Sequence, residues 1–455
     1  MANALNKNQE ILLSIKRLGI NGEGIGYYKR LAVFVPGVLP GEEVVVRITE
    51  TFEQYAKGIA LRLKGDPSPF RVEPKCKKYD TCGGCQLMHM TYEAQLTAKR
   101  NLVIEAFNRY FDGSLNEKVF KQTIGATNPW FYRNKVKHPV RYDGEKLVTG
   151  LYEAGSNRLV YINKCYVEDE LISKTMHSIC EYLTKYEVIA YNPKIKDGIL
   201  RDIVIRISHL TKEMQVTLIL YRYDERTIKI AKGLLAIAYV ESVYYSINND
   251  LDAVENFGAE TVHLVGKEAI TNKLGEFKFE ILPTAFFQLN HEQTEKLYDE
   301  AIKIAHLKGY ENLVDAYCGV GTIGLYAAPH VKEVRGIDIN KEAITNAKKN
   351  AEINNIKNAS FYSGNILPHM HNFSKKGFNA DVIIVDPPRT GLDINFIRYL
   401  QNNPVSKLVY ISCNPATLAK NCNHLNSKYH ILTIQPLDMF PQTAAVETIC
   451  LLEKR

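Results

Sequence analysis

The sequence predicts an α/β protein whose C-terminal part is a doubly wound, mostly parallel sheet, preceded by a small β-barrel and a central α+β region. From residue 277 onward, apolar strand-like runs alternate with helix-like segments. A glycine-rich loop follows an early strand of this part, where such folds bind nucleotide-like ligands. Residues 1–67, in contrast, contain short strands separated by glycine and proline turns. We therefore predict domains over residues 1–67, 68–276 and 277–455.

The N-terminal domain is expected to be all-β. Residues 11–15, 31–35 and 43–48 have strand-like composition, and Pro36-Gly37 and Pro40-Gly41 mark a turn between the last two. Several short strands within about 60 residues are typical of an OB-like barrel, the oligonucleotide-binding type. Composition alone equally allows another kind of small β-barrel.

The central domain begins with a cysteine cluster and continues with a predicted amphipathic helix over residues 92–111. Leu96, Val103 and Phe107 recur at helical spacing in that helix. Residues 202–206 and 215–220 are strand-like and predict an antiparallel α+β layer.

The C-terminal domain is predicted to be Rossmann-like because its strands and helices alternate regularly. Its predicted strands are residues 312–315, 333–338, 381–386 and 407–412, with a helix over residues 342–354.

Composition excludes some classes of protein and leaves others open. The chain has 455 residues, 45% of them hydrophobic and 24% charged, as is usual for a globular protein. No apolar run is long enough to span a bilayer, and residues 1–10 lack the apolar segment of a signal peptide. We therefore expect a cytoplasmic protein without a membrane partner. The net charge of +7 allows a polyanionic partner without requiring one.

The predicted cofactor site lies in the glycine loop, residues 315–324. Gly319 and Gly321 let the backbone approach a ligand closely, and Asp338 ends the next strand, where an acid accepts hydrogen bonds from ribose hydroxyls. These features do not separate a nicotinamide cofactor from S-adenosylmethionine. Asp386, followed by two prolines at a later strand end, favours a methyltransferase over a dehydrogenase.

Two further strand-end residues suggest covalent chemistry on a pyrimidine. Cys413 follows an apolar strand and precedes Asn414-Pro415, and Glu447 lies in the closing segment. A thiolate added at C6 of uracil makes C5 nucleophilic, and a carboxylate then removes the C5 proton. We predict Cys413 as the nucleophile and Glu447 as the proton acceptor. A buried structural cysteine is the alternative at position 413.

Three of the nine cysteines form a cluster, Cys76, Cys82 and Cys85, with two glycines before the last. In a cytosolic chain such spacing indicates metal ligands, and Cys165 is the predicted fourth. Spacing alone leaves structural zinc and a [4Fe-4S] cluster about equally favoured.

Aromatic and basic residues alternate in residues 130–138, which allows an RNA-binding surface or an ordinary solvated strand. Gln288, next to the aromatic pair Phe286-Phe287, could face the cofactor.

Taken in this order, the motifs resemble the RNA 5-methyluridine methyltransferases, specifically the branch acting on 23S ribosomal RNA. The resemblance covers nearly the whole chain. It implies that residues 1–67 form a TRAM domain and that Cys76, Cys82, Cys85 and Cys165 hold a [4Fe-4S] cluster. It implies S-adenosylmethionine contacts from Gln288, Tyr317, Asp338 and Asp386, with Cys413 and Glu447 as catalytic residues. The expected substrate is 23S ribosomal RNA with its target uridine flipped out, and no protein partner is required.

Two other functions stay open. A transfer-RNA 5-methyluridine enzyme is the nearest rival, although its commonest relatives lack the barrel and the cysteine cluster. An RNA-binding iron–sulfur protein with an inactive methyltransferase fold is the second, but the chain keeps both Cys413 and Glu447.

Overall fold

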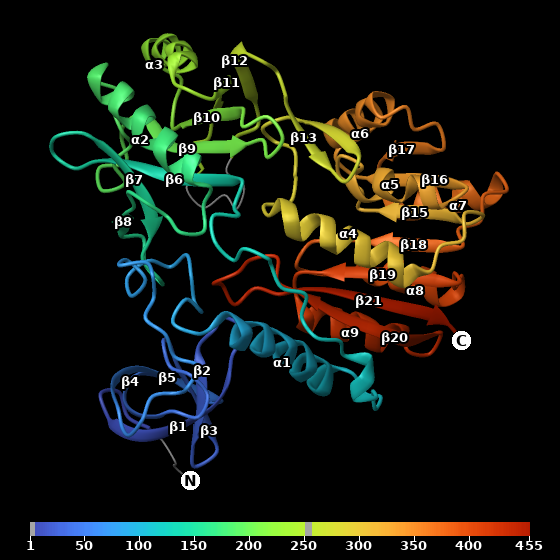
Figure 1. Ribbon diagram of the computed structural model, residues 1–455, viewed down its shortest axis with the longest axis horizontal. Helices are drawn as coiled ribbons and strands as arrows, with labels where there is room; N and C mark the ends of the chain where they lie inside the picture. Colours follow the sequence, from blue (N-terminus) through green and yellow to red (C-terminus); the bar gives the residue numbers. More distant parts are fainter. Residues whose placement is uncertain (1–4, 251–256) are drawn as a thin grey trace.

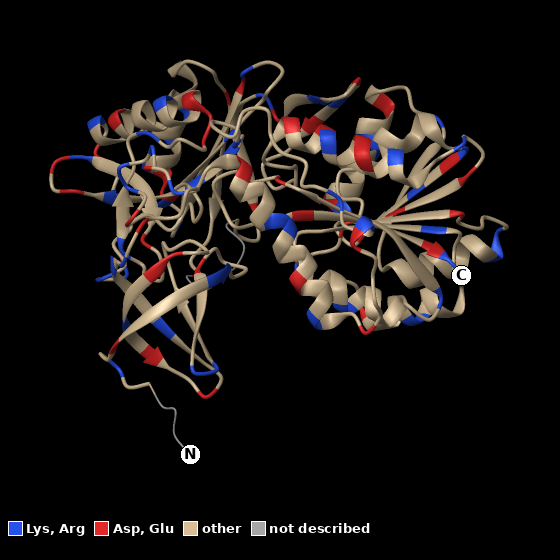
Figure 2. Ribbon diagram, turned by 60° about the horizontal axis from the view of Figure 1, so that its bottom comes forward, with Lys and Arg blue, Asp and Glu red and all other residues tan. Residues whose placement is uncertain are grey.

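The computed structural model describes residues 5–250 and 257–455. Figure 1 shows three parts: a small N-terminal barrel, a central sheet with its helices, and a C-terminal α/β layer that contains the chain end. Figure 2 shows Lys and Arg interspersed with Asp and Glu over all three parts. In this view, the net positive charge is therefore not confined to one part of the molecule.

The N-terminal part is a closed five-stranded barrel with strand order β1-β2-β3-β5-β4. Alternate residues of β1 and β4, among them Leu13, Ile15, Val44 and Val46, are buried in its interior. This confirms the predicted barrel. Its strands are β1 (Glu10–Leu18), β2 (Gly24–Tyr28), β3 (Leu31–Val35), β4 (Glu43–Thr51) and β5 (Tyr55–Leu63).

The central part is a seven-stranded sheet of order β12-β11-β10-β9-β6-β7-β8. All neighbouring strands are antiparallel except the parallel pair β10 and β11. Its strands are β6 (Lys135–Tyr142), β7 (Leu147–Tyr152), β8 (Leu159–Tyr161), β9 (Leu200–Ile207), β10 (Met214–Leu220), β11 (Val240–Ile247) and β12 (Thr261–Gly266). Its helices are α2 (Glu170–Lys185), α3 (Glu225–Ala231) and the 3-10 helix η2 (Lys232–Ala236).

The C-terminal part is a second seven-stranded sheet, of order β17-β16-β15-β18-β19-β21-β20, in which β21 runs antiparallel to its neighbours. The predicted doubly wound sheet is thus confirmed. Its strands are β15 (Asn312–Ala316), β16 (Glu333–Asp338), β17 (Ala359–Ser363), β18 (Val382–Val385), β19 (Lys407–Ser412), β20 (Tyr429–Leu437) and β21 (Glu447–Lys454). Its helices are α4 (His291–Ala305), α5 (Thr322–Ala327), η3 (Ala328–His330), α6 (Lys341–Ile353), α7 (Ile366–Lys375), α8 (Ile394–Asn402) and α9 (Pro415–Leu425).

Three segments that include residues of the predicted central region pack against the C-terminal part instead. Helix α1 (Tyr92–Tyr110) lies beside α9, and its Val103 and Phe107 are buried with residues of the C-terminal core. The short helix η1 (Glu117–Val119) leads to Phe120, which bridges in parallel to Ile434 of β20. The hairpin of β13 (Ile270–Leu274) and β14 (Phe277–Ile281) packs against α6. The chain therefore crosses between the two sheets more than once.

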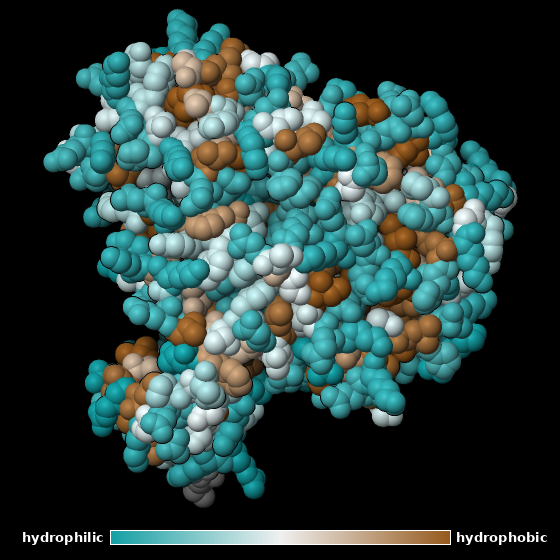
Figure 3. Space-filling view, in the orientation of Figure 1, coloured by the Kyte–Doolittle hydropathy of each residue, from teal (hydrophilic) through white to brown (hydrophobic). Residues whose placement is uncertain are grey.

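On the face drawn in Figure 3, hydrophobic residues form small groups among hydrophilic ones, including a group on the barrel. Among the residues that the structure describes, none of the helices combines the length and the apolar character required to cross a membrane.

Candidate active site

The predicted catalytic and cofactor residues gather at one edge of the C-terminal sheet. Asp338 ends β16, while Asp386 and Cys413 directly follow β18 and β19. These strands are parallel, so their carboxyl ends meet at the same edge. Glu447 begins the antiparallel strand β21 and therefore lies at that edge too.

Strand pairing brings Cys413 and Glu447 together. Ser412, the last residue of β19, pairs with Thr448 of β21, so the residues one step further, Cys413 and Glu447, are neighbours across the ladder. Asn414 caps α9 by accepting hydrogen bonds from two backbone amides of its first turn, and Pro415 occupies the first helical position. The backbone around Cys413 is thus fixed between a strand end and a capped helix.

Burial raises the pKa values of these groups, and negative neighbours add to the rise at Cys413 and Glu447. Burial, then the charges of Glu447 and Asp386, raises the pKa of Cys413 to about 11, while Arg389 opposes the rise. Burial and the charge of Asp386 raise the pKa of Glu447 to about 8, and burial raises that of Asp386 to about 7. A nearby cation would favour the charged form of all three groups.

The loop after β18 is tied to the start of α9. The backbone oxygen of Arg389 accepts hydrogen bonds from Asn414 Nδ2 and Thr417 Oγ1, both at 3.2 Å. Gly391 has φ +84°, and a Cβ there would lie 2.3 Å from Thr417 Cγ2. Only glycine fits this close approach, which holds Asp386 and Cys413 in a fixed relation.

The glycine loop is fixed to the ends of β15 and β16. Asp338 accepts a 2.9 Å hydrogen bond from the amide of Gly319 on Oδ2 and a 2.8 Å bond from Asn340 on Oδ1. A Cβ at Gly319 would meet no atom within 4 Å, so the loop faces open space there. Gly321 has φ +81° and lies against Phe361. The loop can therefore accept a ligand beside Gly319.

Gln288 lies on the segment that enters α4 from the central domain. Its side chain is largely buried, and its backbone oxygen accepts a 3.1 Å hydrogen bond from Asn134 Nδ2. Tyr317, with φ +69°, follows β15 and donates its amide to Ile337 of β16 at 2.9 Å. Both residues thus lie on segments fixed next to the strand ends.

Two charged groups of this site, the acid Asp315 and the base Arg389, were not predicted from the sequence. Asp315 is fully buried: Oδ2 accepts a 2.7 Å hydrogen bond from the amide of Gly324, while Oδ1 has no hydrogen-bond partner in the part of the chain that the structure describes. Burial, with smaller effects of Asp386 and Asp338, raises its pKa to about 7. Its place at the start of the glycine loop was the available signal. Arg389 is exposed, and only its electrostatic effect on Cys413 and Glu447 indicates a role.

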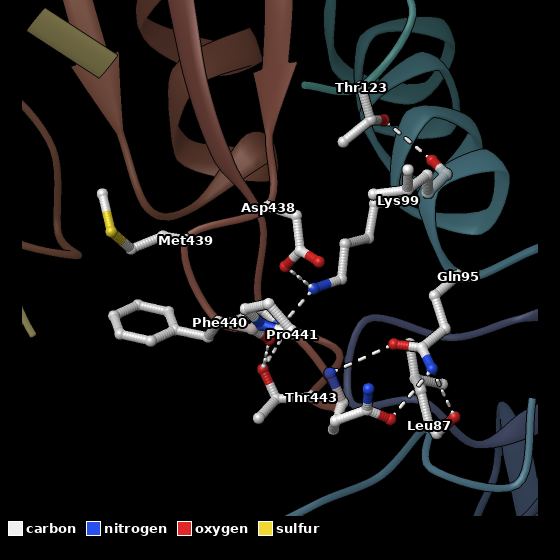
Figure 4. A network of polar contacts seen from close by, with 12 residues as sticks. Leu87, Gln95, Lys99, Thr123, Asp438, Met439, Phe440, Pro441 and Thr443 are labelled. Atoms are coloured by element: carbon white, nitrogen blue, oxygen red, sulfur yellow. Dashed lines mark hydrogen bonds and ion pairs between the residues drawn. The ribbon is translucent and has the colours of Figure 1, made fainter. Parts of the chain in front are cut away.

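The loop between β20 and Glu447, residues 438–446, is held by a buried ion pair (Figure 4). The ammonium group of Lys99, on α1, contacts Asp438 Oδ1, and both side chains are wholly inaccessible to solvent. Lys99 also donates to the backbone oxygen of Phe440 at 3.1 Å, and the Tyr92 hydroxyl donates to Asp438 Oδ2 at 3.0 Å. Both oxygens of Asp438 are thereby satisfied from α1.

The same loop is bonded to the cysteine-rich segment. The backbone oxygen of Gln442 accepts hydrogen bonds from the amides of Gln86 at 3.1 Å and Leu87 at 3.0 Å. Gln95 of α1 exchanges hydrogen bonds with Gln442, at 3.1 Å in each direction. The Tyr132 hydroxyl donates to the backbone oxygen of Pro441 at 2.9 Å. Residues between Gln86 and Tyr132, far from this loop in the sequence, therefore fix the approach to Glu447.

The four predicted metal ligands lie in one neighbourhood. Burial raises the pKa of Cys85 to about 12, with contributions from the charges of Cys82 and Cys76. Burial, then Glu168 and Cys85 among other neighbours, raises the pKa of Cys165. The amide of Gly84 donates to Cys82 Sγ at 3.4 Å. The thiols are close enough to influence one another's ionisation.

Across residues 5–250 and 257–455, no three His, Cys, Asp or Glu side chains are arranged to hold a metal ion.

The chain is similar to known RNA methyltransferases over nearly its whole length. A solved structure from Pyrococcus abyssi, a tRNA (uracil-54, C5)-methyltransferase in complex with S-adenosyl-L-homocysteine, covers 97% of this chain and 100% of its own, with a TM-score of 0.77 and 27% identity. The fold is thus that of a methyltransferase. Residues 5–61 match the TRAM domain, and residues 91–455 match the family model tRNA (Uracil-5-)-methyltransferase. The chain belongs to this family.

Close relatives share the full length. An RNA methyltransferase of Bacillus cereus is 42% identical over 453 residues, covering 99% of this chain and 98% of its own length. One from Listeria innocua is 43% identical over 456 residues, covering 100% and 99%. The barrel, the cysteine segment and the catalytic sheet are therefore shared as one architecture.

Proposed function

We propose that this protein methylates C5 of a uridine in 23S ribosomal RNA, with S-adenosylmethionine as methyl donor and Cys413 as covalent nucleophile. The observation that carries the proposal is the cross-strand pairing that makes Cys413 and Glu447 neighbours at the ligand-binding edge of the sheet. The functional division follows the predicted domains: RNA binding by residues 1–67, cluster binding by 68–276 and methyl transfer by 277–455. The reaction takes place in the cytoplasm.

In this reaction, the Cys413 thiol gives its proton to solvent and its sulfur bonds to C6 of the flipped uracil, which moves the electron pair of the C5–C6 double bond toward C5. S-adenosylmethionine would supply the electrophilic methyl group that C5 takes, and S-adenosyl-L-homocysteine would leave with the electron pair of the broken sulfur–methyl bond. Glu447 then accepts the C5 proton. The returning electron pair restores the double bond and expels the Cys413 thiolate.

The carboxylate cluster supports a cationic donor. Asp315, Asp386 and Glu447 are buried or partly buried acids whose pKa values are raised mainly by burial, and Arg389 offsets only part of the rise at Glu447. The sulfonium of S-adenosylmethionine would add a positive charge beside them. Gln288, Tyr317, Gly319, Gly321, Asp338 and Asp386 are the proposed contacts to the donor, with Asp338 assigned to its ribose. The S-adenosyl-L-homocysteine bound to the Pyrococcus abyssi enzyme agrees with this assignment.

We assign the four clustered cysteines, Cys76, Cys82, Cys85 and Cys165, to a [4Fe-4S] cluster. Each thiolate of such a cluster binds a different iron atom, so the sulfurs need not converge on one point. The neighbourhood of thiols, with one backbone amide donating to sulfur, fits that requirement. The cluster would crosslink the loop around Cys82 to the segment around Cys165. Anaerobically purified protein should contain about four irons and four sulfides; stoichiometric zinc without iron would contradict the assignment.

Transfer RNA is the second candidate substrate, because the Pyrococcus abyssi structure, named as a tRNA methyltransferase, covers the whole architecture of this chain. The barrel and the cysteine region therefore do not separate the two substrates. Supplying purified enzyme with 23S ribosomal RNA and with total transfer RNA, both lacking 5-methyluridine, and mapping new 5-methyluridine by mass spectrometry decides between them. Methylation of transfer RNA alone would reject the ribosomal assignment.

The covalent step has its own test. Target RNA carrying 5-fluorouridine should give a denaturation-resistant adduct, because fluorine cannot leave C5 as a proton does. The Cys413→Ala variant should give none, and Cys180→Ala, at a buried cysteine of α2 in the central part, is the matched control. Equal trapping by Cys413→Ala would mean that another residue is the nucleophile.

A further inference from the structure

Three aromatic rings and two lysines form a surface patch beside the cysteine segment: Trp130, Phe131, Tyr166, Lys75 and Lys164. The Tyr166 ring packs edge-on to Trp130 with centroids 6.4 Å apart and lies 5.9 Å from the Phe131 ring. All three rings are partly exposed. Phe131 has φ +54°, an unusual conformation for a bulky residue, which turns the chain at the patch.

The lysines give this patch, here called the Trp130 patch, a positive charge. Lys75 Nζ lies 4.4 Å from the centroid of Trp130, and Lys164 Nζ lies 5.3 Å from that of Phe131 and 5.4 Å from that of Tyr166. Lys164 also pairs with Glu170 Oε1 at 3.2 Å. Partly exposed rings together with exposed cations are the combination that holds single-stranded nucleic acid, by stacking on bases and attracting phosphates.

A basic hollow continues from Lys164 along α2. Its volume is about 540 Å³, and Lys164, Lys174 and His177 line it together with Ser173 and Glu170. A backbone phosphate in this hollow would lie beside two lysines and one carboxylate.

The Trp130 patch is joined directly to the loop that precedes Glu447. The amide of Phe131 donates to Tyr166 O at 2.9 Å, while the next residue, Tyr132, donates its hydroxyl to Pro441 O at 2.9 Å. The Arg133 guanidinium lies 5.6 Å from the centroid of Phe440 in the same loop. One short segment therefore presents Trp130 and Phe131 outward and contacts the catalytic loop with its following residues.

We infer that the Trp130 patch binds the single-stranded RNA that flanks the target uridine, with a flanking base stacked on the aromatic rings and the next phosphates in the hollow along α2. This inference rests on the proposed function and specifies its substrate as RNA with an unpaired segment next to the target. Stacking a neighbouring base would hold the strand open while the target uridine is extruded.

Trp130 is the only tryptophan of the chain, so intrinsic tryptophan fluorescence reports on this patch alone. Titration of the full-length protein with a labelled single-stranded RNA of about 12 nucleotides, within the range of single-strand binding sites, should quench Trp130 fluorescence as anisotropy of the label rises. Trp130→Ala should weaken binding by roughly 5- to 150-fold, the range of one base–aromatic stack, and Trp130→Phe should restore most of it. Lys174→Gln should lower the slope of log affinity against log salt by about one.

Tyr310→Ala is the matched control, since Tyr310 is exposed and precedes the amino end of β15, away from the catalytic edge. Unchanged fluorescence at saturating RNA, or wild-type affinity of Trp130→Ala, would overturn the patch as the RNA site. If wild-type protein still forms the 5-fluorouridine adduct in that case, the proposed function stands and only the patch is rejected. Absence of both the adduct and RNA binding would reject the proposed function itself.

Discussion

Two buried acids at opposite ends of one loop, Asp438 and Glu447, have opposite electrostatic surroundings. Asp438 receives the ammonium of Lys99 and the hydroxyl of Tyr92, so its charge is compensated within the chain. Glu447 instead lies near Asp386, and its pKa rises to about 8. A compensated buried charge fixes structure, whereas an uncompensated one is available to a cationic ligand. The loop thus joins a structural anchor to a group that is prepared for chemistry.

The largest expected effect comes from the catalytic pair. Cys413→Ala should lower the methylation rate by roughly 10⁴-fold or more, because no adduct can form. Glu447→Gln should lower the rate by roughly 10²- to 10⁴-fold and should accumulate a covalent complex with ordinary uridine RNA, since the C5 proton remains. Denaturing gels of protein with methyl donor and RNA measure this difference. A Glu447→Gln variant without accumulated complex would assign proton removal to another group.

The second largest expected effect is a loss of stability when the buried Lys99–Asp438 ion pair, the anchor of the loop, is broken. Lys99→Met leaves Asp438 buried without its counter-ion and should cost about 3–5 kcal/mol of unfolding free energy. Replacing both partners, as Lys99→Met with Asp438→Leu, should recover much of that loss because neither charge is then buried. Urea unfolding followed by circular dichroism measures both.

An exposed ion pair provides the control for the anchor. Lys57 contacts Glu50 at 3.1 Å on the barrel surface, and about half of each side chain is accessible to solvent. Lys57→Met should therefore cost only about 0–1 kcal/mol. If Lys99→Met costs no more than this, Asp438 is not held by a structural ion pair and the contrast with Glu447 fails.

The sequence was sufficient to predict those strands and site residues whose positions depend on local sequence patterns. Strands β3, β16 and β19 begin and end at the predicted residues, because β3 and β19 are largely apolar runs and β16 begins and ends at a charged residue. Asp338, Asp386 and Cys413 could be placed together because strand ends of a parallel sheet share one edge.

Contacts between segments that are distant in the sequence could not be predicted from a local sequence pattern. Lys99 and Asp438 are 339 residues apart, and a single buried lysine within a helix does not indicate its partner. Helix α1 was correctly predicted as a helix, but its packing against α9 depends on how the chain crosses between the two sheets. The anchor of the catalytic loop could therefore be found only in the structure.

The smallest expected effect tests the uncompensated acids by ligand binding. S-adenosylmethionine carries a sulfonium charge that S-adenosyl-L-homocysteine lacks, so it should bind about tenfold more tightly once Asp315, Asp386 and Glu447 are ionised, an amount that corresponds to one pKa unit. Burial raises the pKa of Asp386 to about 7 and, with Asp386, that of Glu447 to about 8. Affinity for the sulfonium should rise with pH through this window, while affinity for the neutral product stays nearly constant.

Without ligand, the folding stability of the protein should fall as pH rises, whereas affinity for the sulfonium should increase. Because the folded pKa values of these acids lie above their unfolded values, their contribution to stability is present at low pH and is lost as pH rises through about 7 to 8. Bound S-adenosylmethionine should offset that loss. Isothermal titration at several pH values measures both ligands, with Asp386→Asn expected to reduce the difference and Glu300→Gln, in a surface pair with Lys303, expected to preserve it. Equal affinities for the two ligands at every pH would show that the acids at the strand ends do not face the sulfonium.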